Sequence, residues 1–92
     1  MKVVTRINDL KYDFEKQLKQ EQLRLEMSSA EFAKYIGMHK SWLLKLWSAT
    51  EPRHPLSEKT MALINNRVGI SYDTMIKYNE EVMRDRENKW AV

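Results

Sequence analysis

Apolar side chains recur every three or four residues along the first part of the chain, which is the spacing of one face of an α-helix. This pattern predicts a helix from Ile7 to Leu25, with lysine, glutamate and glutamine side chains on its other faces. Glu15 and Lys19 form an i,i+4 pair on such a polar face, which stabilises a helix by about 0.3–0.5 kcal/mol when both are exposed. The apolar positions are Ile7, Leu10, Phe14, Leu18 and Leu25.

A second helix is predicted to begin directly after Ser28. The Ser28 hydroxyl can accept a hydrogen bond from the N-terminal turn, and Glu31, three residues later, can complete a capping box. Apolar residues at helical spacing continue from Ser29 to about Ile36. Gly37 then ends the helix, because glycine adopts a left-handed backbone at little cost.

Three further helices are predicted. One covers Lys40 to about Ala49, with Leu43, Leu46 and Trp47 at core spacing, and two prolines in residues 50–55 prevent its continuation. Ser57 caps a fourth helix that Gly69 terminates, and Ser71 caps a fifth. The apolar stripe of the fifth helix is expected to comprise Tyr72, Met75, Ile76, Asn79, Val82 and Met83.

Length and composition agree with a single all-α domain. The 92 residues include 42% apolar residues but only two glycines and two prolines, which favours long helices with short connections. We expect one compact five-helix domain, divided into an N-terminal arm (1–6), a helical core (7–83) and a charged C-terminal tail (84–92) that frays. The β-branched run within residues 1–5 is compatible with a short strand or a flexible arm.

Several classes of function lack support in the sequence. Without cysteine there is no disulfide or thiolate metal site, and His39 and His54 stand apart with no paired ligand, so no metal and no other cofactor is expected. No glycine-rich phosphate loop or catalytic set is visible, which argues against an enzyme. Apolar runs are too short to cross a membrane, and we expect a cytoplasmic protein. The net charge of +3 is only mildly basic.

The stretch from Ser28 to Ser48 meets the steric demands of a helix-turn-helix. The first helix needs inward apolar residues and a small residue where the second helix crosses. The turn needs a residue that tolerates positive φ, followed by an apolar plug, and the second helix needs two inward apolar residues three apart. The residues that meet these demands in register are Phe32, Ala33, Ile36, Gly37, Met38, Leu43 and Leu46.

With this pattern and its flanking helices, the chain resembles the phage-repressor family of helix-turn-helix domains, of the Cro-like or XRE type, over residues 15–76. The resemblance implies a compact five-helix repressor-like DNA-binding domain, in which the helix after Gly37 enters the major groove. The residues then expected to contact bases are His39, Lys40, Ser41, Leu44, Lys45 and Ser48. Those expected to contact phosphates are Ser28, Ser29, Lys34, Arg53, His54, Ser57 and Lys59.

The chain departs from the family at two tryptophans. Trp42 and Trp47 occupy positions where the family has polar residues, threonine or serine for the first and glutamate for the second. Trp42 is compatible with the core, with a contact to DNA sugars, or with a protein interface. Exposed tryptophan is typical of interaction hot spots, so a protein partner bound through Trp42 and Trp47 is an alternative.

The sequence thus predicts sequence-specific binding to double-stranded DNA. We expect a transcriptional repressor or regulator of a phage, plasmid or other mobile element, associated with the nucleoid. A homodimer on a palindromic site would double the surface buried on DNA. Either the N-terminal arm and first helix or the C-terminal helix supplies the dimer contact, and the C-terminal helix is favoured. Two alternatives stay open, namely an excisionase-like or replication accessory protein that binds DNA, and a protein–protein interaction module on the same scaffold.

Overall fold

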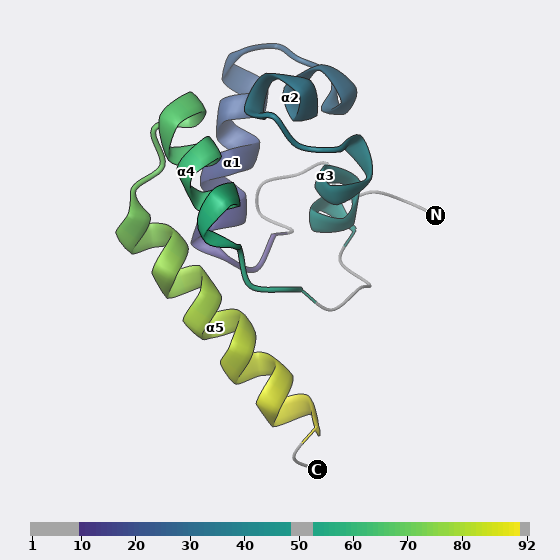
Figure 1. Cartoon of the computed structure of the whole chain (residues 1–92). Coiled ribbons are helices and arrows are strands. Elements are labelled where there is room, and N and C mark those ends of the chain that lie inside the picture. The colour runs from purple at the N-terminus through teal and green to yellow at the C-terminus, as the bar shows by residue number, and fades with distance from the viewer. Residues whose placement is uncertain (1–9, 49–52, 91–92) are drawn as a thin grey trace.

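The computed structural model describes residues 10–48 and 53–90, with the side chains of 88–90 excepted. Within these ranges the chain forms five α-helices and no strand, which confirms the predicted all-α fold (Figure 1). The helices are α1 (Asp13–Arg24), α2 (Ser29–Ile36), α3 (Lys40–Trp47), α4 (Glu58–Val68) and α5 (Tyr72–Trp90).

Serine side chains begin three of these helices. The Ser28 hydroxyl accepts a hydrogen bond from the Glu31 N–H, and the Glu31 carboxylate accepts one from the Ser28 N–H, so the predicted capping box is present. Ser57 caps α4 and Ser71 caps α5 by accepting the N–H three residues on. Each hydroxyl satisfies a helix N–H that has no partner within the helix.

Left-handed residues end three helices. Gly37 follows α2 with φ of 81°, and Gly69 follows α4 with φ of 80°, as the sequence predicts. After α1 the left-handed residue is Glu26, with φ of 54°. A side chain disfavours this conformation by about 1–2 kcal/mol, so packing around the α1–α2 turn has to hold Glu26 there.

The five helices share one hydrophobic core. Helix α2 packs against α3 and α4, while α5 packs against α1 and α4. Helices α1 and α5 therefore lie side by side, although they are far apart in sequence (Figure 1). The largest fully buried apolar side chains are Trp47, Tyr78, Phe14, Phe32, Leu18, Ile36, Leu43, Ile64, Met75 and Val82.

A buried ion pair lies where α1, α5 and the end of α3 meet. The carboxylate of Glu15 is fully buried, and the Nε of Arg53 donates to it at 2.6 Å. The Tyr78 hydroxyl donates to the same oxygen at 3.0 Å. Arg53 also donates to the backbone carbonyls of Leu46 and Ser48, at 3.0 and 2.9 Å. One guanidinium therefore joins α1 to the C-terminus of α3.

The pKa of the Glu15 carboxyl reflects two opposing influences. Burial, the larger one, raises it above its ordinary value, whereas the hydrogen bonds and charge of Arg53 and the hydroxyl of Tyr78 lower it. Burial and the neighbouring Glu15 charge also raise the pKa of Tyr78 well above its usual range. Tyr78 therefore stays protonated and remains a hydrogen-bond donor to Glu15.

Lys19 is buried beside this cluster, which changes the interpretation of the Glu15–Lys19 pair. The stabilisation of an exposed i,i+4 pair does not apply here, since both side chains are buried and Glu15 is held by Arg53. The Lys19 ammonium lies 4.8 Å from the centre of the Trp47 ring and 3.3 Å from the Gln22 side-chain oxygen. Burial lowers the pKa of Lys19. Lys19 of α1 is thus packed against Trp47 at the end of α3.

Helix α1 begins later than the sequence predicts. Leu10 is buried but lies outside the helix, and Tyr12 has an extended backbone before the first turn at Asp13. The side chains of Lys11 and Tyr12 both donate to Asp85 of α5, each at 2.6 Å. These two contacts join the segment before α1 to α5.

Helix α5 differs from the prediction in length and in exposure. It continues to Trp90, so residues 84–90 belong to the helix rather than to a fraying tail. Asp85 of this segment is bound by Lys11 and Tyr12, directly before α1, and these contacts anchor it. Of the predicted stripe, Tyr72, Ile76 and Met83 are exposed rather than buried. The predicted arm (1–6), the start at Ile7, the end of the third helix at Ala49 and the last two residues lie outside the described ranges.

No helix among the described residues is long and apolar enough to span a bilayer. The longest, α5, is rich in charged residues throughout.

Replacing Arg53 by Met tests the buried ion pair. The variant leaves the Glu15 carboxylate buried without its cation, and we expect a loss of about 3–5 kcal/mol in the free energy of unfolding. The measurement is urea unfolding followed by circular dichroism. The double variant Glu15→Met/Arg53→Met should lose less than the single one, whereas Lys11→Met, at an exposed ion pair, should change stability by less than about 1 kcal/mol. A double variant less stable than the single one would contradict the pairing.

Replacing Phe32 by Ala tests the core beneath α2. Phe32 is fully buried, so loss of its ring leaves a cavity and should lower the free energy of unfolding by about 3–5 kcal/mol. Thermal and urea unfolding measure the change. Leu23→Ala is the control, because this side chain is 53% exposed and its truncation should change stability by no more than about 0.5 kcal/mol.

Candidate nucleic-acid interface

Helices α2 and α3 form a helix-turn-helix joined by residues 37–39. A β-carbon added at Gly37 would meet Leu63 of α4 at 3.5 Å, which is ordinary contact, so the positive φ rather than space requires glycine here. Met38 is partly buried against the core, and its sulfur lies 4.0 Å from the Thr60 hydroxyl. The turn therefore packs against α4.

The apolar residues of the motif face the interior. Together they anchor both helices so that one side of α3 is directed away from the core. The buried members are Phe32, Ala33, Ile36, Leu43 and Leu46, and Met38 is partly buried.

The outward side of α3 carries the residues that the sequence assigns to base contacts, with one exception. Lys40, Ser41 and Lys45 are exposed, and Leu44 is half-buried. The helix contains two lysines and no acidic residue. Ser48 is 2% exposed, so its side chain does not reach this surface and we remove it from the set.

His39 caps α3 in a geometry that determines its tautomer. The Nδ1 atom accepts the Ser41 backbone N–H at 3.1 Å and lies 2.8 Å from the Ser41 hydroxyl. An accepting Nδ1 carries no proton, so in the neutral ring the proton is on Nε2. His39 thus presents an N–H donor at the beginning of α3. When the Ser41 hydroxyl shares the Nδ1 lone pair by donating to it, the hydroxyl oxygen keeps its own lone pairs for a further partner.

The N-terminus of α2 is held by a residue that the sequence analysis missed. The side-chain amide of Gln22 donates to the Met27 carbonyl at 3.1 Å and to the Ser29 hydroxyl at 3.3 Å. The capping box already occupies the N–H groups of Ser28 and Glu31, which leaves those of Ser29 and the next residue without a capping partner. The signal for Gln22 was its position within the apolar stripe of the first helix, between Leu18 and Leu25.

The segment before α4 contributes His54, Ser57 and Lys59, which are all exposed. It is attached to α5, because the Asn79 amide donates to the Leu56 carbonyl and accepts from the Leu56 N–H, at 3.1 and 2.6 Å. Arg53 differs from the other predicted phosphate contacts, since its guanidinium is directed inward to Glu15. We therefore remove Arg53 from the contact set. Lys34 is exposed on α2.

The two tryptophans have different environments. Trp47 is fully buried, so it belongs to the core and cannot present its ring to a protein partner. Its indole N–H has no hydrogen-bond partner among the described residues. Trp42 is half-buried and packs against the core from the side of α3. A partner-binding surface built on both rings is therefore excluded.

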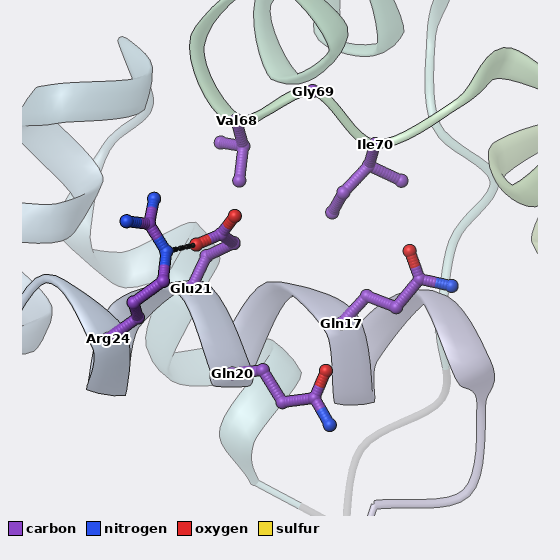
Figure 2. A pocket seen from close by; sticks show the side chains of 7 residues that line it. All are labelled: Gln17, Gln20, Glu21, Arg24, Val68, Gly69 and Ile70. Carbon is purple, nitrogen blue, oxygen red and sulfur yellow. Dashed lines mark hydrogen bonds and ion pairs between the residues drawn. The ribbon is translucent and has the colours of Figure 1, made fainter.

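A shallow groove of about 340 Å³ lies on another part of the molecule, between α1 and the α4–α5 turn (Figure 2). Figure 1 shows this turn and α3 on opposite sides of the structure. The charged groups lining the groove, Glu21 and Arg24, form an ion pair with each other, so the lining has no excess charge. The other lining residues are Gln17, Gln20, Val68, Gly69 and Ile70.

Among the residues in ranges 10–48 and 53–87, no three metal-ligating side chains come together. Comparisons of the chain with protein-family models, with curated proteins and with solved structures found no match.

Two alanine variants test whether backbone conformation alone requires glycine at positions 37 and 69. Gly37→Ala and Gly69→Ala each place a side chain at φ near 80°, so each should lower the free energy of unfolding by about 1–2 kcal/mol. Gly69 has open space around it and serves as the reference for backbone strain alone. Urea unfolding should give similar losses for the two variants. A much larger loss at Gly37 would show that close packing against Leu63, and not backbone conformation, selects glycine in the turn.

Proposed function

We propose that this protein binds double-stranded DNA sequence-specifically, with α3 in the major groove, and acts as a transcriptional repressor or regulator of a phage, plasmid or other mobile element. The supporting observation is the two-sided character of α3. Its apolar side is buried, and its outward side carries Lys40 and Lys45 with no acidic residue. In this function the protein is a DNA-binding protein of the cytoplasm, associated with the nucleoid, and not an enzyme.

The exposed groups of α3 match the hydrogen-bonding groups of base edges. Lys40 and Lys45 donate to guanine acceptors or to phosphates, and His39 donates through Nε2–H. The oxygen of Ser41 accepts from adenine or cytosine amino groups once its proton is directed to His39. Leu44 contacts a thymine methyl group. These five residues replace the six that the sequence alone suggested, because Ser48 is buried.

The flanking elements supply phosphate contacts in this proposal. The N–H groups at the start of α2, including that of Ser29, are suited to a phosphate oxygen. Lys34, His54 and Lys59 add charged or polar donors on α2 and around the start of α4. Such contacts position the domain on DNA and make binding sensitive to salt, while α3 discriminates between sequences.

A homodimer on a palindromic site completes the proposal. One short helix-turn-helix buries limited surface, and two copies related by a two-fold axis would place their α3 helices about 34 Å apart, on half-sites one helical turn apart.

Selection of bound sequences from a random DNA pool at physiological salt tests this function directly. We expect enrichment of one motif, with two inverted half-sites about 10 base pairs apart. Failure to enrich any motif, with the folded chain verified by circular dichroism, would overturn sequence-specific DNA binding.

Lys45→Ala tests α3 as the helix that contacts DNA. We expect it to weaken binding to the selected site by about 1–3 kcal/mol and to reduce the dependence of affinity on salt. The measurement is fluorescence anisotropy over a salt series. Arg24→Ala removes a cation that lines the groove and is already paired with Glu21, so it should leave affinity unchanged. Full affinity of a Lys40→Ala/Lys45→Ala variant would exclude α3 from the interface.

A further inference from the structure

Helix α5 has an exposed apolar stripe that no other described element covers. Tyr72, Ile76 and Met83 are 44%, 48% and 43% exposed. Their spacings of four and seven residues place them along one line of the helix. The core side of α5 is distinct, since Met75, Tyr78 and Val82 are buried. Figure 1 shows the C-terminal half of α5, the part of the helix to which Met83 belongs, projecting beyond the other helices.

The stripe lies on the flank of α5 that adjoins the segment before α4. Asn79, which is next to the stripe on the helix surface, holds the Leu56 backbone. That segment carries His54 and Lys59, two of the proposed phosphate contacts. A partner bound along the stripe would therefore lie near the proposed DNA surface without covering α3.

Exposed charges beside the stripe alternate in sign. Asp73, Lys77, Glu80 and Arg84 follow one another at intervals of four, three and four residues. In a parallel pair of α5 helices related by a two-fold axis, with the apolar stripes facing each other, the two charged rows would lie on opposite flanks of the contact and would not pair. In an antiparallel pair centred between Lys77 and Glu80, Asp73 faces Arg84 of the partner subunit, and Lys77 faces Glu80 of the partner subunit. The charge pattern is thus complementary to itself only when the helices are antiparallel.

We propose that this surface of α5 binds a second copy of the chain, with the two α5 helices antiparallel across a two-fold axis. The apolar stripes of the two copies cover each other, and the alternating charges pair along one side. The inference deepens the proposed function by naming the surface that forms the homodimer, and it rests on that function for the two-fold DNA site. One helix pair is a small contact, so association is weak in solution and is strengthened by binding to adjacent half-sites.

Charge reversal with rescue tests the surface in the absence of DNA. Lys77→Glu/Arg84→Glu makes the row wholly acidic, and Asp73→Lys/Glu80→Lys makes it wholly basic. We expect sedimentation velocity over a concentration series to show dimers of the unmodified chain at the highest concentrations, and each variant alone to associate at least about tenfold more weakly. An equimolar mixture of the two variants should recover dimers. Lys16→Glu/Arg24→Glu makes the same charge change on α1 and should leave association unchanged.

Single cysteines test the orientation, because the chain has none of its own. Asp73→Cys and Glu80→Cys both replace an exposed carboxylate on the same side of α5. With a rise of about 1.5 Å per residue, the two copies of position 80 are offset along the axis by about 4.5 Å, and those of position 73 by about 16 Å. Oxidation should therefore link Glu80→Cys chains far faster than Asp73→Cys chains. Equal or reversed rates would overturn the antiparallel arrangement.

The outcomes separate this inference from the proposed function. A chain that stays monomeric over the whole concentration series, or a variant mixture that does not associate, overturns the α5 surface even when the chain binds its selected site. Dimers that show the expected charge rescue support the surface even when no DNA motif is enriched. Circular dichroism of every variant verifies that lost association does not reflect unfolding.

Discussion

The buried ion pair between Glu15 and Arg53 connects the scaffold to the proposed DNA-binding helix. A carboxylate without solvent is strongly destabilising unless a cation and hydrogen-bond donors surround it, and Arg53 and Tyr78 provide both. The same guanidinium holds the Leu46 and Ser48 carbonyls at the end of α3. One guanidinium therefore satisfies acceptors in α1 and at the end of α3, and Tyr78 joins α5 to the same carboxylate.

The hydrogen bonds of Arg53 hold the C-terminal end of α3, and local hydrogen bonds hold its N-terminal end. His39 caps the first turn of α3, while Gln22 of α1 ties down the start of α2. With both ends held, the outward side of α3 has a defined position relative to α2. Helix α5 has two different sides. One side packs into the core through Tyr78, and another leaves Ile76 exposed.

The sequence by itself determined the helix boundaries wherever a local signal marks them. Ser28 and Ser57 begin helices, and Gly37 and Gly69 end them, because capping and positive φ involve only a few neighbouring residues. The sequence also determined the all-α class and the buried side of the helix-turn-helix, since apolar spacing depends on helical geometry alone. The exposed lysines of α3 followed from the same spacing.

Only the tertiary structure decided which neighbour covers each side chain. Arg53 looked like an exposed loop cation, and its inward direction depends on Glu15, thirty-eight positions away in the chain. Tyr12, directly before α1, is bound to Asp85 of α5, seventy-three positions away in the chain. Tyr72 and its apolar neighbours along α5 have helical spacing but no covering element. Periodicity shows that one side of a helix can be buried, whereas the packing partners determine which part of that side is covered.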